Sequence, residues 1–135
     1  MHSTLEQVAG ALARATLRFA REEELQEGVA RLLAAAGLTA RREVVLSRPD
    51  RPDRPDRPDR VHRVDRLDLL LDDGLAIEVK LEGSRSALLR QLRRYADHER
   101  VRALLVVTPR ARLADLPATL GQKPLRAVHL VRSCL

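Results

Sequence analysis

Aromatic residues, cysteine and lysine are scarce in this sequence of 135 residues. Trp and Asn are absent, Cys, Met, Phe and Tyr occur once each, and only two of the 25 basic residues are lysine. The single cysteine, Cys134, excludes an intramolecular disulfide and a cysteine-based zinc site, which favours a cytoplasmic protein. Two aromatic side chains cannot form a stacking platform for single-stranded nucleic acid. No apolar run is long enough to span a membrane, and we expect neither a membrane partner nor a small-molecule cofactor.

Basic charge is concentrated in the last third of the chain. Residues 84–135 carry eleven basic and three acidic side chains, whereas residues 61–83 carry three basic and six acidic ones. An acidic segment followed by a basic one suits a polyanionic partner whose phosphates approach a group of carboxylates. The alternative is an arginine-rich composition with no ligand at all.

The length of the chain suits one domain with a single core. Residues 48–59 consist of four Arg-Pro-Asp triplets, and proline at every third position with no apolar side chain excludes both a helix and a central strand. We therefore expect a low-complexity loop at 48–60 inside a single domain that spans residues 1–135.

Hydrophobic spacing predicts an α/β domain. Apolar residues three or four positions apart predict helices at 5–19, 25–36 and 84–99, of which the first two could be one long helix broken near Ala20 and Arg21. A turn or short helix is expected at 113–120. The predicted strands are 41–47, 61–71, 75–82, 102–108 and 125–131. This order implies a mixed sheet with helices packed against it.

A predicted hairpin with its loop at 72–74 brings two carboxylates together. Along its second strand every second residue is apolar, so Glu78 and Lys80 share the opposite face. A three-residue loop sets Asp68 opposite Glu78. A two-residue loop would set Asp68 opposite Val79 and mix polar with apolar residues on both faces, so the hydrophobic pattern selects the first register.

Facing carboxylates destabilise a sheet unless a cation lies between them. Asp68 and Glu78 offer the hard oxygen ligands that Mg²⁺ prefers, while water and phosphate can complete its coordination. Lys80 can orient or deprotonate an attacking water, or neutralise negative charge in the transition state. Its presence in a chain that otherwise uses arginine argues against a generic surface cation. The alternative is a solvent-facing hairpin with ordinary surface charges.

Gln91 and Tyr95 lie one turn apart on the next predicted helix. Together, Asp68, Glu78-Val79-Lys80 and the segment 91–95 resemble the motifs of the PD-(D/E)XK nuclease superfamily, especially its RecB-like and archaeal Holliday-junction-resolvase-like branches. The resemblance covers residues 22–108. It implies a restriction-endonuclease-like αβββαβ core, with a mixed central sheet flanked by helices.

The resemblance also implies roles for individual residues. The implied metal ligands are Asp68, Glu78 and the backbone carbonyl of Val79, with Mg²⁺ as cofactor and Mn²⁺ as a substitute. It implies a catalytic role for Lys80, and DNA-binding or site-bracing roles for Gln91 and Tyr95. For Gln91 and Tyr95, packing of the helix is the alternative.

Many members of the superfamily carry a further acidic ligand on the first helix of the core. In this chain Gln26 stands at the resolvase-like position, which is a departure from that pattern. Glu22, Glu23 and Glu27 are close enough in sequence to substitute, and Glu27 is the candidate we favour.

Four arginines on or near the helix at 84–99 are candidates for contacts with the DNA backbone: Arg85, Arg90, Arg93 and Arg94. The sequence thus favours Mg²⁺-dependent hydrolysis of DNA phosphodiester bonds by an endonuclease acting on duplex or branched DNA. By analogy with the resolvase-like branch, this would be a homodimer with a role in DNA recombination or repair. The alternatives are a catalytically inactive DNA-binding or interaction module of the same fold, and a basic α/β protein with no nucleic-acid role.

Overall fold

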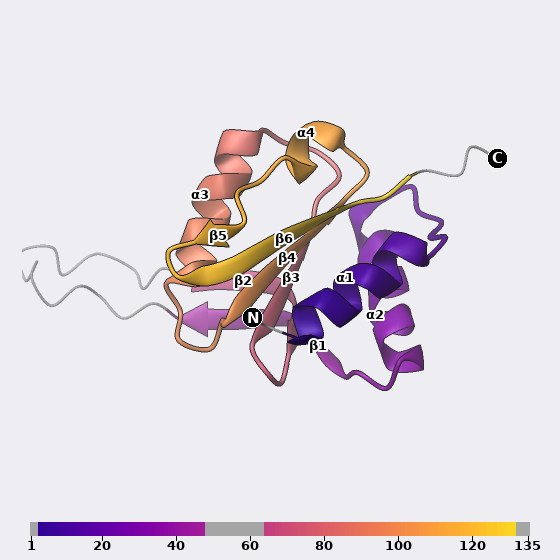
Figure 1. The fold of residues 1–135 in the computed structure, drawn as a ribbon, viewed down its shortest axis with the longest axis horizontal. Helices are drawn as coiled ribbons and strands as arrows, with labels where there is room; N and C mark the ends of the chain where they lie inside the picture. The colour runs from indigo at the N-terminus through magenta and orange to yellow at the C-terminus, as the bar shows by residue number, and fades with distance from the viewer. Residues whose placement is uncertain (1–2, 48–63, 132–135) are drawn as a thin grey trace, which may run out of the picture.

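A computed structural model of the chain describes residues 3–47 and 64–131 (Figure 1). The helices are α1 (Ser3–Arg14), α2 (Glu22–Ala35), α3 (Arg85–Ala96) and α4 (Ala111–Ala114), and the strands are β1 (Ala40–Ser47), β2 (Val64–Leu71), β3 (Leu75–Val79), β4 (Ala103–Thr108), β5 (Thr119–Leu120) and β6 (Lys123–His129). The loop predicted at 48–60 and Cys134 lie outside the described residues. Within the two described ranges, no helix is long and apolar enough to cross a membrane.

The described strands form one mixed sheet in the order β1-β2-β3-β4-β6-β5. β1, β2 and β3 are antiparallel neighbours, β3, β4 and β6 run parallel, and β5 returns antiparallel to β6. Helix α3 connects β3 to β4, as a crossover between parallel neighbours requires. The prediction of an α/β fold with a mixed sheet flanked by helices is therefore confirmed.

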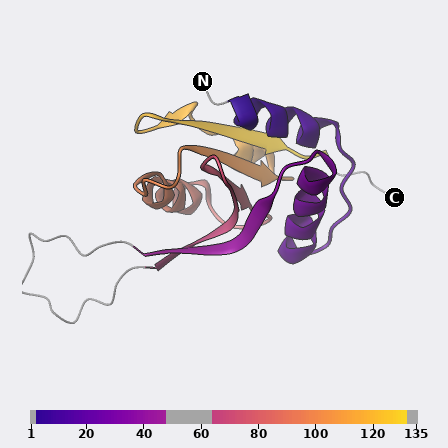
Figure 2. The ribbon, with the colours of Figure 1, turned by 90° about the horizontal axis from the view of Figure 1, so that it is seen from below.

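Helices cover the two faces of the sheet in separate layers (Figure 2). On one face α1 and α2 pack against a cluster that includes Leu69, Ile77 and Leu105. On the other face α3 and α4 pack against a second cluster that includes Ala76 and Leu104. Because both faces are covered, all residues of β3 and β4 are buried, and all of them except Glu78 and Thr108 are apolar.

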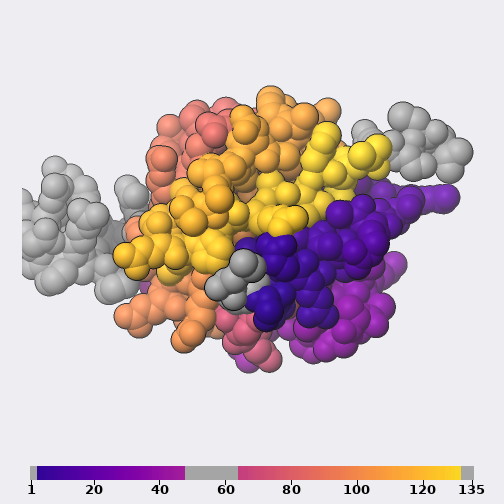
Figure 3. Space-filling view, viewed as in Figure 1, coloured from indigo at the N-terminus to yellow at the C-terminus, as the bar shows by residue number. Residues whose placement is uncertain are grey.

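Helix α1 lies beside β6 on the surface drawn in Figure 3. Glu6 of α1 forms an ion pair with Arg126 of β6, while Val8 and Leu12 are buried beneath the helix. This contact joins the first and last elements of the described chain, which are far apart in sequence.

The hairpin between β2 and β3 has the predicted register. Leu69 lies opposite Ile77 and Leu70 opposite Ala76, which requires a three-residue loop at 72–74. Gly74 closes this loop at φ 95°, and a Cβ at this position would lie 2.9 Å from the carbonyl oxygen of Arg100. Glycine is therefore required both by the left-handed backbone and by the close approach of the 100–102 segment.

Several element boundaries differ from the predictions. The first predicted helix extended to Phe19, but α1 ends at Arg14. The Glu24 carboxylate accepts hydrogen bonds from the N–H groups of Ala20 and Arg21 and so caps α2, which begins at Glu22. The segment expected to be a turn or helix at 113–120 contains the short helix α4 and the two-residue strand β5. Neither difference moves the hairpin.

Candidate active site

Asp68 lies where β1 and β2 bend together. The residue opposite it in β1, Glu43, has a φ of 52°. Leu67 packs into the cluster beneath α3, whereas Leu69 packs into the cluster beneath α2, although residues two apart in a regular strand share a face. The bend allows the Asp68 carboxylate to reach the end of β3, where its Oδ2 accepts a hydrogen bond from the Val79 N–H at 2.8 Å.

Glu78 is a buried carboxylate that faces Asp68. It is 5% exposed, and its Oε2 has no hydrogen-bond partner among the described residues. Burial, followed by the negative charge of Asp68, raises the pKa of Glu78 well above its ordinary value. Burial also raises the pKa of Asp68, and the hydrogen bond from Val79 opposes this shift. One buried and one half-buried carboxyl group, both with raised pKa values, form a site that would be stabilised by a cation.

The donor set around these carboxyl groups fits a hard divalent cation. Glu78 Oε2 is buried and unpartnered. The N–H and C=O of one strand residue point to the same neighbour, so the Val79 carbonyl is also directed toward the β2 side, where Asp68 lies. Among the described residues, no three His, Cys, Asp or Glu side chains converge on one point. Mg²⁺ needs only one or two carboxylates, because it keeps several waters and often takes phosphate oxygens.

Glu22, at the start of α2, is the acidic residue that α2 contributes to this site. Its Oε1 accepts a hydrogen bond from the Leu81 N–H at 3.1 Å, and its charge contributes to raising the pKa values of Asp68 and Glu78. Gln26, one turn later, is 7% exposed, and its Oε1 has no partner among the described residues. The first turn of α2 therefore directs polar groups toward the end of β3.

The prediction of Glu27 as the acidic residue that the helix contributes to the site is wrong, because its side chain lies elsewhere. Glu27 forms an ion pair with Arg31 at 2.7 Å, and both side chains are at least half exposed. Five residues separate Glu27 from Glu22, which is about 140° around the helix axis at 3.6 residues per turn. The two side chains cannot point toward the same strand end, and Glu22 is the one that reaches it.

Lys80 is held by a chain of side-chain hydrogen bonds from α3. Its Nζ donates to Gln91 Oε1 at 3.4 Å, and Gln91 Nε2 donates to the Tyr95 hydroxyl at 2.7 Å. That hydroxyl donates in turn to the backbone carbonyl of Arg66 at 2.8 Å. Ser84 caps the N-terminus of α3 by accepting from the Ala87 N–H, so the helix that carries Gln91 and Tyr95 begins at Arg85, a short loop after the end of β3.

Tyr95 is not available for a contact with DNA. It is 3% exposed, and burial followed by the negative charge of Glu78 raises the pKa of its hydroxyl. The prediction of Tyr95 as a DNA-binding residue is therefore wrong. Its position agrees with the other expectation, that it braces the site through Gln91.

The four arginines predicted to hold DNA have different environments. Arg90 and Arg93 are exposed on α3, and no hydrogen bond or ion pair to another described residue engages their side chains. Arg94 is instead half-buried and donates to Asp65 at 3.2 Å, so its expected role in DNA binding is not supported by its surroundings. Arg85 donates to the backbone carbonyl of Asp115 at 2.7 Å. A contact with the DNA backbone stays a prediction for Arg90 and Arg93.

Two contacts near the site could not be anticipated from the sequence. Arg110 donates to the carbonyl of Leu81 at 3.1 Å and forms an ion pair with Glu82, so it holds the residue whose N–H binds Glu22. Asp65 is buried and bonds both Arg94 and His98. Neither pairing has a sequence signal, because the partners lie about 30 residues apart and meet only through the sheet.

Comparison of the chain with protein-family models, with curated proteins and with solved structures found no match in any of the three.

Proposed function

We propose that this protein is a metal-dependent deoxyribonuclease of the PD-(D/E)XK kind. The observation that carries the proposal is the meeting of Asp68 and buried Glu78 at the end of β3, with Lys80 directly after this strand. The order α2, β1, β2, β3, α3 and β4 supports it, because this is the αβββαβ order of the restriction-endonuclease-like core. DNA, duplex or branched, is the proposed substrate, and a homodimer remains a prediction.

The proposed metal ligands are Asp68, Glu78 and the backbone carbonyl of Val79. When bound, Mg²⁺ would supply Lewis-acid chemistry at the scissile phosphate and a water of lowered pKa, and Mn²⁺ would substitute for it. A bound cation would favour the ionised form of both carboxyl groups and so oppose the effect of burial on their pKa values. The hydrogen bond from the Val79 N–H keeps the Asp68 carboxylate directed at this site.

Lys80 is the proposed catalytic side chain. Gln91 Oε1 accepts from Lys80 Nζ, so the amine is held beside the carboxylates and not extended into solvent. From this position Nζ can orient the attacking water, accept a proton from it, or neutralise the negative charge that develops on the oxygens of the scissile phosphate. Gln91 is the positioning residue, since its own orientation is fixed by Tyr95.

The experiment that tests this function is incubation of supercoiled plasmid and of a four-way junction with the purified protein. We expect cleavage with Mg²⁺ or Mn²⁺ and none with EDTA, and we expect Asp68→Asn to remove it. Cleavage that persists in Asp68→Asn would overturn the site assignment. A protein that binds DNA but never cuts it would favour the alternative function of an inactive DNA-binding module. That alternative is favoured by one observation, Gln26 at the position where the resolvase-like branch carries an acidic ligand.

Glu22 and Glu27 offer a matched comparison on one helix. Glu22→Gln is expected to weaken Mn²⁺ binding by about 10- to 100-fold, the usual effect of removing a group in the outer shell of a metal site. Glu27→Gln removes the same charge from the exposed side of α2 and is expected to change the affinity by less than about twofold, because solvent screens it. Titration calorimetry with Mn²⁺ measures both. Equal effects of the two substitutions would contradict the assignment of Glu22.

A further inference from the structure

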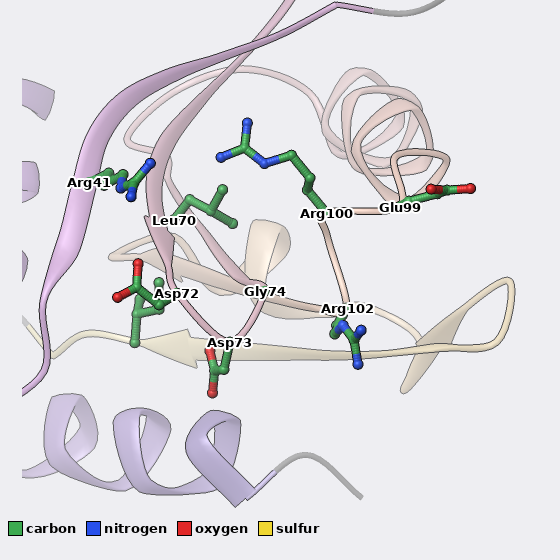
Figure 4. Close-up of a pocket in the computed structure, with 9 residues that line it drawn as sticks. Arg41, Leu70, Asp72, Asp73, Gly74, Glu99, Arg100 and Arg102 are labelled. Atoms are coloured by element: carbon green, nitrogen blue, oxygen red, sulfur yellow. The ribbon is translucent and has the colours of Figure 1, made fainter.

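A pocket of about 450 Å³ lies at the hairpin end of β2 and β3 (Figure 4). Its walls come from β1, from the hairpin loop and from the segment that enters β4, and Leu70 lies in its lining. The pocket is separate from the carboxylate site. Three arginines border it: Arg41, Arg100 and Arg102.

These three guanidinium groups differ from most arginines around the candidate active site. Arg94 and Arg110 are bound by carboxylates. In contrast, no hydrogen bond or ion pair with another described residue engages the side chains of Arg41, Arg100 and Arg102, and all three residues are exposed. Each retains the full set of donors that a guanidinium offers to an oxyanion.

The backbone fixes where two of these arginines stand. Arg41 lies directly opposite Leu70 in the β1–β2 register, so both side chains are on the same face of the sheet. Because residue 74 is glycine, the 100–102 segment can approach the hairpin loop closely, and the Gly74 carbonyl accepts a hydrogen bond from the Arg102 N–H at 2.8 Å. In Figure 4 the side chain of Arg100 extends above Leu70 toward β1, on which Arg41 lies.

Three acidic residues also line the pocket, so its net charge alone does not attract an anion. Asp73 Oδ1 accepts a hydrogen bond from the Leu75 N–H and so belongs to the turn. The carboxylate of Glu99 points away from Arg41 and Leu70 (Figure 4). Asp72 remains on the Arg41 side. We therefore attribute the attraction for an anion to the guanidinium groups of Arg41 and Arg100, whose N–H donors suit the oxygens of a phosphate.

We propose that Arg41 and Arg100 together hold one backbone phosphate of the DNA substrate in the pocket above Leu70. This inference rests on the proposed function, because DNA is its ligand. The walls of the pocket are mostly polar, whereas pockets for small molecules are mostly apolar. This difference favours a backbone phosphate as the ligand.

The distance to the carboxylate site suits one continuous DNA footprint. Leu70 and Asp68 are two residues apart in β2, which is about 7 Å along the strand. Each strand of B-DNA carries a phosphate for about every 3.4 Å of helix axis. A duplex bound at Asp68 and Glu78 would therefore present a second phosphate near the pocket, and the grip would fix the position of the scissile phosphate.

The test is the salt dependence of duplex DNA binding in EDTA, where no cleavage occurs. Affinity falls as the salt concentration rises, and each phosphate contact that is lost makes the slope of log affinity against log salt concentration less steep by about 0.9. Because both arginines share one phosphate, we expect the Arg41→Ala/Arg100→Ala double variant to lose about 0.9 in slope and not about twice that value. Arg31→Ala is the matched control. It removes an exposed arginine from α2 on the opposite layer and should leave the slope unchanged.

The outcomes separate this inference from the proposed function. A slope unchanged in the double variant while the wild-type protein still cuts DNA would overturn the phosphate site alone. A less steep slope in the double variant, together with a wild-type protein that never cuts DNA, would support the phosphate site and overturn the proposed nuclease function. A change in slope that corresponds to about two phosphates would contradict the proposal that both arginines hold the same phosphate. Failure of the wild-type protein to bind duplex DNA at all would overturn both.

Discussion

Replacing Glu78 by glutamine should abolish metal-dependent DNA cleavage while making the metal-free protein more stable at pH 8. Loss of a metal ligand removes several kcal/mol of transition-state stabilisation, which corresponds to a fall of at least about a thousandfold in rate. Stability should rise because the folded wild-type protein at pH 8 must either keep a proton on Glu78 or bury its charge, whereas a neutral amide requires neither. We expect a gain of about 1 kcal/mol or more, since a tenfold change in proton affinity corresponds to about 1.4 kcal/mol.

The pH dependence of this effect follows from the raised pKa values. The folded state keeps protons on Asp68 and Glu78 at pH values where the unfolded chain has released them. The stabilisation from these protons is therefore complete below the unfolded pKa, whose ordinary value is 4.5 for Glu78, and is lost as the pH rises through the folded pKa. Urea unfolding between pH 4 and pH 9 in EDTA should show a falling free energy for the wild-type protein and a flatter profile for Glu78→Gln.

Glu82→Gln is the control for this comparison. Glu82 is exposed and follows the same strand, so its substitution tests a nearby loss of negative charge without changing the buried pair. We expect cleavage within about twofold of wild type, since an exposed ion pair contributes little. If Glu78→Gln were destabilising in EDTA, the assignment of a strained, unliganded carboxylate pair would be wrong.

Replacing Lys80 by arginine should reduce cleavage by about 10²- to 10⁴-fold without removing the metal site. Arginine keeps the positive charge, but it cannot give up a proton near neutral pH, and its planar fork does not fit the position of a compact amine. Mn²⁺ affinity should change little, because Lys80 is not a proposed ligand. Single-turnover cleavage of a labelled duplex, together with Mn²⁺ titration, measures the two effects separately.

The only other lysine in the chain supplies the control for this substitution. Lys123 donates to the backbone carbonyl of His98, at a distance from the carboxylates, so Lys123→Arg should leave cleavage close to wild type. If Lys80→Arg retained full activity, only the charge of Lys80 would matter and its proposed role in proton transfer would be removed. If Lys80→Arg lost Mn²⁺ binding as well, the side chain would act on the metal site itself.

The hairpin could be predicted from the sequence because its information is local. Alternation of apolar residues on β3 and a glycine at position 74 leave one register, and that register places Asp68 opposite Glu78. The strand β4 could be predicted for the same reason, since an uninterrupted apolar run such as Leu104–Val107 requires cover on both faces. Both depend only on side-chain polarity along a few residues.

The helix acid could not be predicted, because it depends on where α2 begins and how it is rotated against the sheet. Glu22 and Glu27 are both acidic residues near the start of one helix, and only packing decides which reaches the end of β3. Tyr95 shows the same limit. Its place on α3 predicts proximity to Gln91, but whether it faces DNA or the core depends on how deeply α3 packs.

The central claim is that Asp68 and Glu78 form one divalent-cation site, and titration calorimetry with Mn²⁺ tests it most directly. The account predicts that the wild-type protein binds Mn²⁺, that Mg²⁺ competes for the same site, and that Asp68→Asn and Glu78→Gln each remove this binding while the proteins remain folded. Binding of Mn²⁺ with unchanged affinity in both variants would contradict the account.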